Sequence, residues 1–238
     1  MSAECKTCAR DRRGFLSLVA ASAAMASFFR TSSAFSANAT TTVSVDEALV
    51  KLKAGNEKYV SAPQLCASDL AAQREHVAKV QAPWAVILTC SDSRVPPELL
   101  FGGLGLGELF VARNAGNMAD TATMGTIEYG VEHLGVPLVV VMGHERCGAV
   151  AAACDVVAKH ASFPGSIGPM VSAIVPAAKS VYGKPGDFVD NTVRESAKRT
   201  AAKIATTSPI VSHFIKDNKV KVVAARYDLD DGRVEFLT

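Results

Sequence analysis

Residues 84–94 read WAVILTCSDSR and residues 137–148 read PLVVVMGHERCG. Each stretch opens on an unbroken apolar run and passes into a polar segment that contains a cysteine. Unbroken apolar runs of this length are typical of parallel strands covered on both faces. The two stretches therefore predict two strands of an α/β sheet, each with metal-ligand chemistry at its carboxyl end, where ligands bind in such sheets.

The rest of the chain alternates between short apolar runs and segments of helical character. Strands are predicted at 84–89, 109–112, 137–142 and 220–227, with an edge strand at 233–237 after the turn Asp230-Asp231-Gly232. A capping-box pattern from Ser44 to Glu47 predicts an opening helix that packs on its own domain or on a partner subunit. Further helices are predicted at 121–134, 148–160, 167–182 and 187–206. Strands that alternate with helices predict one α/β domain, a mainly parallel central sheet flanked by helices.

Composition narrows the class of protein. The chain has 238 residues, of which 49% are hydrophobic and 20% charged, and this is ordinary globular usage rather than disorder. The net charge of +2 hides an asymmetry, because residues 1–39 carry five basic and two acidic residues and the remainder is net −1. A nearly neutral body without a basic run gives no electrostatic reason to expect binding of nucleic acid or of an anionic membrane.

The amino-terminal segment has the features of an export signal. A twin-arginine pair, Arg12-Arg13, precedes an apolar stretch at 16–29 and an A-x-A-like site at Ala37-Asn38-Ala39. The apolar stretch is about 14 residues long, shorter than the roughly 20 that span a bilayer. We therefore predict a cleaved signal at 1–39, a mature domain at 40–238, a periplasmic or otherwise exported location and no stable membrane anchor after cleavage. An uncleaved anchor is the alternative.

The polar ends of the two stretches share a donor set. They supply two thiols, an imidazole and a carboxylate from Cys90, Cys147, His144 and Asp92. Zinc takes such donors tetrahedrally, and a fourth position left to water or substrate is typical of catalytic zinc. Taken alone, Cys90 is most simply a small buried side chain and His144 a core histidine. Their joint position at two strand ends favours a zinc site.

These residues also match a family. Cys-Ser-Asp-Ser-Arg at 90–94, followed some fifty residues later by His-x-x-Cys-Gly at 144–148, resembles the zinc signature of the β-class carbonic anhydrases. The resemblance continues through 95–98, 107–117 and 143–150. It implies that 40–238 is a β-carbonic anhydrase catalytic domain in a dimer or higher even oligomer. It also implies reversible hydration of carbon dioxide to bicarbonate and a proton by a zinc-bound hydroxide.

The resemblance assigns residues to roles. It implies that Cys90, His144 and Cys147 bind zinc, and that Asp92 either takes the fourth position or turns away to pair with Arg94. It implies a substrate pocket at Gln81, Val95, Phe110 and Tyr129, with all of these except Val95 contributed across a subunit interface. Arg113 is expected to hydrogen-bond to the backbone of the loop after its strand, whereas Glu145 and Arg146 are expected to be solvent-facing loop charges.

The resemblance also indicates a subtype. Gln81 lies nine residues before Cys90, where the plant-like subtype carries a substrate-binding glutamine. Ile87 stands where the bicarbonate-regulated subtype carries a tryptophan, so no regulatory bicarbonate site is expected.

Two other functions use the same donors. Hydrolases of carbon disulfide or carbonyl sulfide share this fold and these ligands. A noncatalytic zinc protein is the alternative of another class, but such a site has no need of the pair Asp92 and Arg94.

Overall fold

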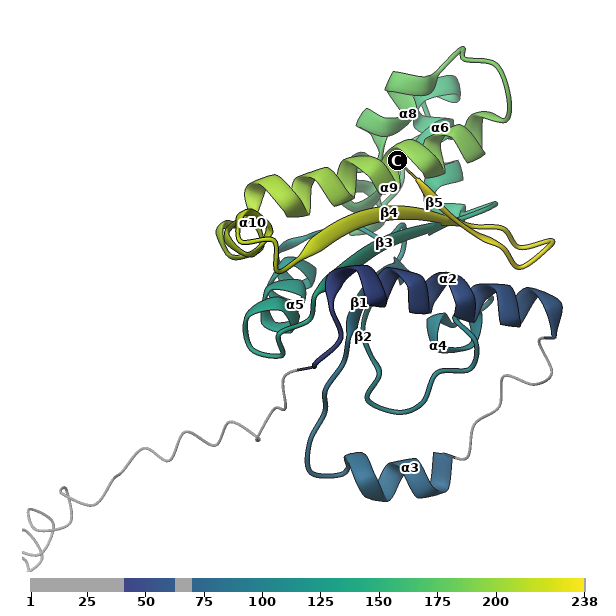
Figure 1. Ribbon diagram of the computed structural model, residues 1–238. Coiled ribbons are helices and arrows are strands. Elements are labelled where there is room, and N and C mark those ends of the chain that lie inside the picture. The colour runs from purple at the N-terminus through teal and green to yellow at the C-terminus, as the bar shows by residue number, and fades with distance from the viewer. Residues whose placement is uncertain (1–40, 63–69, 238) are drawn as a thin grey trace, which may run out of the picture. The chain divides into compact units, whose positions relative to one another are not determined.

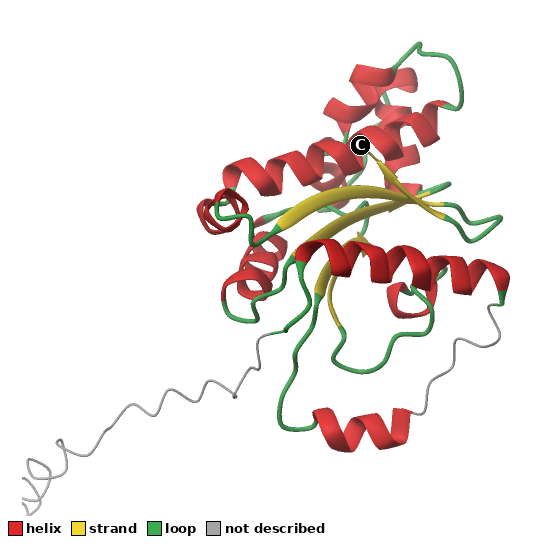
Figure 2. Ribbon diagram, viewed as in Figure 1, coloured by secondary structure: helices red, strands yellow, loops and turns green. Residues whose placement is uncertain are grey.

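The computed structural model describes residues 41–62 and 70–237, and a five-stranded sheet lies at the centre of this part (Figures 1 and 2). The strand order is β2-β1-β3-β4-β5. The strands are β1 Ala85–Cys90, β2 Leu109–Asn114, β3 Leu138–His144, β4 Lys221–Tyr227 and β5 Val234–Leu237, and only β5 is antiparallel to its neighbour. The predicted fold class and all five predicted strands are confirmed. The predicted signal segment 1–39 lies outside the described residues.

Nine helices in the described part flank the sheet. They are α2 Val45–Ser61, α3 Leu70–Val77, α4 Pro97–Leu100, α5 Thr121–Glu132, α6 Gly148–Lys159, α7 Ile167–Ser172, α8 Val175–Val181, α9 Phe188–Thr207 and α10 Pro209–Lys216, with α3 joined to the sheet by the segment that contains Gln81.

Each face of the sheet is covered by its own set of helices (Figure 1). Side chains alternate along a strand, so Val86 and Leu88 of β1 join one apolar cluster with α5, α9 and α10. Ala85 and Ile87 of the same strand join a second cluster with α2 and α4. All six residues of β1 are buried, and a buried aliphatic side chain of this size contributes about 1.5–3 kcal/mol to stability. The sheet is therefore the core of the domain, and its strand ends are held rigidly.

Helix α2 begins with the predicted capping box and packs on its own domain. The Ser44 amide donates to Glu47 Oε2 at 2.8 Å, and the Glu47 amide donates to Ser44 Oγ at 3.3 Å. Further along the helix, the buried Asn56 side chain donates to the carbonyls of Leu100 and Gly232 at 3.0 and 2.9 Å. These bonds tie α2 to α4 and to the turn before β5.

One predicted helix is wrong in its extent. The segment 167–182 was expected to be continuous, but the structure divides it into α7 and α8. Pro176 lies in the first turn of α8, where a backbone N–H would have no hydrogen-bond partner within the helix, so its absence costs no helical hydrogen bond. Within a continuous helix, the same ring would clash with the carbonyl of Ser172, so the chain breaks at this point. Helices α3, α4 and α10 were not predicted at all.

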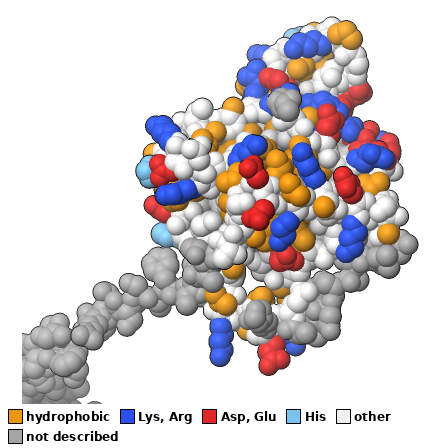
Figure 3. Space-filling model, in the orientation of Figure 1, with side chains coloured by type: hydrophobic (Ala, Val, Ile, Leu, Met, Phe, Trp, Pro, Cys, Tyr) orange, Lys and Arg blue, Asp and Glu red, His pale blue; other side chains and the backbone are white. Residues whose placement is uncertain are grey.

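Acidic and basic side chains are interspersed over the face of the molecule in Figure 3. Among the described residues, no helix is both long and apolar enough to cross a bilayer.

Candidate metal centre

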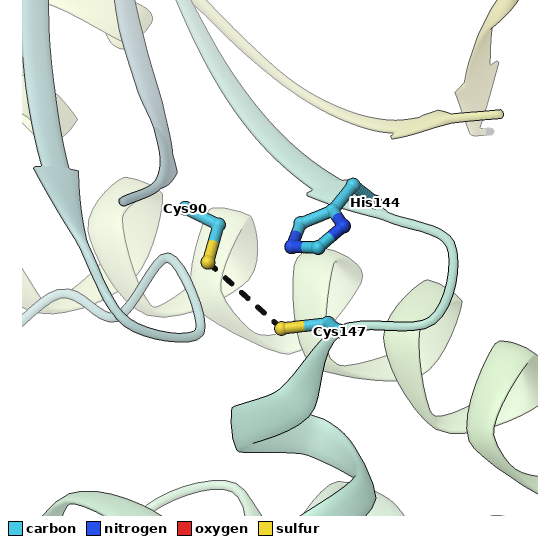
Figure 4. Close-up of side chains that lie close together, drawn as sticks. All are labelled: Cys90, His144 and Cys147. Carbon is cyan, nitrogen blue, oxygen red and sulfur yellow. Dashed lines mark hydrogen bonds between the residues drawn. The ribbon is translucent and has the colours of Figure 1, made fainter. Parts of the chain in front are cut away.

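Three buried donor side chains converge at the carboxyl ends of β1 and β3 (Figure 4). Cys90 is the last residue of β1, His144 is the last residue of β3, and Cys147 is the N-cap residue of α6. The two sulfur atoms lie 3.9 Å apart, and a ring nitrogen of His144 lies within 4.8 Å of both. Because β1 and β3 are parallel neighbours, their ends meet at one edge of the sheet and bring these predicted donors together.

The imidazole of His144 is oriented by the backbone. Its Nδ1 lies 2.8 Å from the carbonyl oxygen of Glu145, which accepts only, so the proton is assigned to Nδ1 and the lone pair to Nε2. The Nε2 atom is buried and has no hydrogen-bond partner in the described part of the chain. An unsatisfied buried polar atom costs about 1–3 kcal/mol. A metal ion bound by Nε2 and the two sulfurs would remove this cost, so the residues fit a zinc ion.

The two thiols are arranged to lose a proton. The hydrogen bond from Cys147 lowers the pKa of the Cys90 thiol, and the Gly116 amide, 3.5 Å from the sulfur, acts in the same direction. The contact with Cys90, and then burial, raise the pKa of the Cys147 thiol, so the pair holds its second proton firmly. A divalent cation that replaces this proton would satisfy both sulfurs at once.

Gly116 was not predicted to take part in the site. It has a φ of 81°, and a Cβ atom there would lie 2.6 Å from Ile174 Cδ1. Only glycine allows the backbone to approach Cys90 this closely. The sequence signal was a glycine soon after the predicted strand 109–112, whereas the pairing of that strand with the strand of Cys90 is visible only in the structure.

Asp92 is turned toward Arg94 in this structure. Arg94 Nε and Nη2 donate to the two carboxylate oxygens of Asp92 at 2.9 and 2.7 Å. This bidentate bond lowers the pKa of the Asp92 carboxyl. Asp92 Oδ2 nevertheless lies 3.8 Å from Nε2 of His144, so the carboxylate remains beside the donor group. Of the two arrangements that the sequence left open, the structure has the one in which Asp92 pairs with Arg94.

Arg113 of β2 holds the loop that carries Asp92, which follows the neighbouring strand β1. Its Nε donates to the Cys90 carbonyl at 2.9 Å, and its Nη2 donates to the Asp92 carbonyl at 2.6 Å. Two bonds from one planar guanidinium fix the backbone on both sides of Ser91. Arg113 does hydrogen-bond to backbone carbonyls, but the predicted loop was wrong: the bonds go to the end of β1 and the loop after it, not to the loop after its own strand β2.

The predicted substrate residues do not reach the donor group within one chain. Phe110 pairs with Val86 near the amino end of β1, and Tyr129 packs on Phe110 with a ring-centroid distance of 6.0 Å. Gln81 precedes β1 altogether. Since a strand rises about 3.3 Å per residue, β1 separates this end of the sheet from Cys90 by about 17 Å. Val95 is nearer in sequence but fully buried in the cluster under α2.

Comparisons with known proteins agree with this geometry. The sequence pattern of the family described as carbonic anhydrase matches residues 85–234. Carbonic anhydrase 2 of Mycobacterium tuberculosis is 37% identical over 182 residues, which cover 76% of this chain and 87% of that protein.

Solved structures give the class of the fold. The β-carbonic anhydrase of Coccomyxa in complex with acetazolamide is similar with a TM-score of 0.62 and 28% identity, covering 76% of this chain and 83% of that one. A tetrameric β-carbonic anhydrase of Sordaria macrospora is similar with a TM-score of 0.62 and 26% identity, covering 70% and 88%. The three donors lie within the residues that match the family pattern, and the fold is that of the β-class structures. The chain therefore belongs to the carbonic anhydrase family and has the fold of its β class.

Proposed function

We propose that this chain catalyses the reversible hydration of carbon dioxide to bicarbonate and a proton, with zinc held by Cys90, His144 and Cys147. One observation carries the proposal: the unpartnered Nε2 of His144 faces two sulfurs, with the Asp92 carboxylate held beside them. Bound zinc would supply a Lewis acid that lowers the pKa of water at the site from about 15.7 toward neutrality.

The surrounding residues then have defined tasks. Asp92 Oδ2 lies where it can accept a hydrogen bond from a water molecule near His144 Nε2. Arg94 lowers the pKa of Asp92 through its side-chain hydrogen bonds, and it fixes the direction of the carboxylate oxygen atoms. Arg94 is exposed, and an exposed ion pair contributes only about 0–1 kcal/mol to stability. The pair therefore serves orientation rather than folding.

Two assays test the proposed reaction. One measures carbon dioxide hydration by rapid mixing, and the other measures sulfide release from carbon disulfide and carbonyl sulfide. We expect hydration that is lost when zinc is stripped and restored when zinc is returned. Sulfide release without hydration would assign the chain to the hydrolases that share these ligands. Stoichiometric zinc with neither activity would indicate a noncatalytic zinc protein.

We also propose that the minimal active unit is a dimer in which a second copy completes the pocket. Gln81, Phe110 and Tyr129 lie at the end of the sheet opposite to the chain's own donor group, which supports a role toward a neighbouring copy. The tetrameric relative from Sordaria macrospora supports assembly of such chains. The same glutamine, together with Ile87 at a fully buried position, supports the plant-like subtype without a regulatory bicarbonate site.

Mixing two inactive variants tests the shared pocket. Gln81→Ala removes a substrate contact, and Cys147→Ala removes a metal ligand. If the two residues act across the interface, unfolding and refolding the variants together should restore about a quarter of wild-type activity, because half of the dimers are mixed and each has one complete site of two. Restoration should be absent if Gln81 serves its own chain, since each chain would then carry one defect. An active monomer at assay concentration would also contradict the shared pocket.

Export by the twin-arginine pathway to the periplasm, with cleavage near residue 39, is a further proposal from the sequence of the first 39 residues. Replacing Arg12 and Arg13 together by lysine should leave unprocessed protein in the cytoplasm, because the pathway reads the paired arginines. Cell fractionation with immunodetection checks this. The matched control is Lys6→Arg with Arg10→Lys, which keeps the charge and leaves the pair intact. Processed protein outside the inner membrane for the double-lysine variant would contradict the proposal.

A further inference from the structure

The two residues between His144 and Cys147 are tied to the turn that joins β4 and β5. The Glu145 amide donates to the Tyr227 carbonyl at 2.9 Å, and Glu145 Oε2 accepts from the Leu229 amide at 3.3 Å. Arg146 has a φ of 52° and donates to both carboxylate oxygens of Asp230 at 2.9 and 2.7 Å. The expectation of solvent-facing loop charges fits Arg146, which is exposed and paired, whereas the Glu145 side chain is only 20% exposed and is held by these contacts.

Arg226 lies at the centre of this attachment. Its side chain is only 11% exposed and faces three carboxylates from three different segments. Its Nε and Nη1 bond to Asp190 of α9 and to Asp228 of the turn, both at 2.7 Å, and its Nη2 lies 3.7 Å from Glu145 Oε1. The planar fork of a guanidinium can hold several acceptors in fixed directions, which an ammonium group cannot do. Arg226 therefore attracts the Glu145 carboxylate, which Arg146 also approaches at 3.4 Å, and links it to α9 and the turn.

The position of Glu145 decides the orientation of His144. The Glu145 carbonyl is the acceptor for His144 Nδ1 at 2.8 Å, and this bond turns Nε2 toward the sulfurs of Cys90 and Cys147 (Figure 4). Partners of this kind behind a metal-binding imidazole set its tautomer and ring orientation. A shift of the Glu145 peptide would move the imidazole with it. The contacts thus form a continuous path from Arg226 through Glu145 to His144.

We propose that Arg226 is a positioning residue for the metal centre, acting through Glu145 on the imidazole of His144. This inference rests on the proposed binding of zinc by Cys90, His144 and Cys147. Arg226→Met keeps a long side chain but removes the guanidinium, so the Glu145 carboxylate keeps only Arg146, 3.4 Å from its Oε2, and loses its link to α9 and the turn. The dissociation constant for zinc should rise about 10- to 100-fold, as is typical when a residue behind a ligand is removed. Arg226→Lys should recover part of that loss because it restores the charge without the fork.

The experiment uses the full mature protein, stripped of metal and titrated with Zn²⁺ against a competing chelator. Co²⁺ is titrated in parallel, because its visible and thiolate absorption bands report the geometry of the bound ion. The matched control is Arg194→Met, the same change at an arginine bonded to Asp190 and Glu235 at 2.9 and 2.7 Å but not to Glu145. Both methionine variants should lower the thermal midpoint. Only Arg226→Met should weaken zinc binding and shift the Co²⁺ spectrum.

Equal zinc affinity in Arg226→Met and wild type would overturn the proposal, and so would an equal loss in Arg194→Met, which indicates general destabilisation. If Arg226→Met does not fold, Glu145→Gln tests the same path, since the amide oxygen still accepts from Leu229 but no longer attracts Arg226. Unchanged affinity and spectrum in Glu145→Gln would then reject the proposal. A wild-type chain that binds neither ion would instead contradict the proposed zinc site itself.

Discussion

Cys147→Ala should abolish both stoichiometric zinc binding and carbon dioxide hydration. The change removes one of the three donors that lie within 4.8 Å of one another and leaves a thiol and an imidazole. A four-ligand zinc site contributes about 10–16 kcal/mol, so one ligand is worth roughly 2.5–4 kcal/mol. This predicts a rise of about 100- to 1,000-fold in the dissociation constant for zinc. Metal analysis after gel filtration, together with rapid-mixing hydration kinetics, measures both effects.

Cys154→Ala is the matched control for this variant. Cys154 is another buried free thiol and belongs to the same apolar cluster as Cys90 and Cys147. Its sulfur lies 3.3 Å from Thr192 Oγ1 and belongs to no donor group in the described residues. Both substitutions remove one buried sulfur, so thermal unfolding should show similar losses of packing. Cys154→Ala should keep its zinc and its activity, whereas full metal retention in Cys147→Ala would refute the ligand assignment.

The sheet and the donor group could be predicted because their signals are local. Unbroken apolar runs such as 84–89 and 137–142 mark strands covered on both faces, and the cysteine and histidine directly follow those runs. The break between α7 and α8 could also have been read from Pro176, since proline removes a helical hydrogen bond. Helix α4 has only four residues and depends on packing against α2, which no pattern within the segment reveals.

The surroundings of the donor group depend on contacts between distant segments. Arg226 comes from the last long strand and Glu145 from the loop after β3, and only the parallel pairing of β3 with β4 brings them together. Glu145 and Arg146 therefore resemble ordinary loop charges in the sequence. In the same way, Gln81 is far from the donor group because it lies at the opposite end of β1, and no sequence motif indicates this distance. Motifs at strand ends predict the donors, whereas the network that orients them requires the fold.

Arg94→Ala should keep zinc and lose activity. Without the guanidinium, the Asp92 carboxylate is an anion beside the three donors, 3.8 Å from His144 Nε2, with no cation to hold it in place. It would then turn toward the metal as a fourth ligand and no longer accept a hydrogen bond from a water at the site. Losing a positioned proton acceptor costs about 10²–10⁴-fold in rate, so hydration should fall by at least about 100-fold. Added zinc should not restore it, because the metal is still bound.

The pH dependence separates this explanation from simple protonation of Asp92. Arg94 holds the pKa of Asp92 well below its usual range, and its removal lets that pKa rise toward about 3.9. The Asp92 carboxylate of the variant therefore stays ionised across the proposed assay range of about pH 6–9 and remains able to accept a proton or hydrogen bond there. The loss of activity should accordingly be similar throughout that range. A loss confined to the acidic end would indicate a protonation effect and contradict the orienting role.

Arg199→Ala is the matched control, because Arg199 has a similarly exposed side chain and forms an ion pair with Glu195 at 2.6 Å on α9. It should leave zinc content, rate and pH profile unchanged. Asp92→Asn removes the negative charge and replaces one acceptor oxygen by an NH2 donor but retains Arg94, so it should lose activity to a similar extent while zinc remains bound. If Arg94→Ala keeps near-normal activity across about pH 6–9, then Asp92 needs no cation to direct it, and the pair is an ordinary surface ion pair.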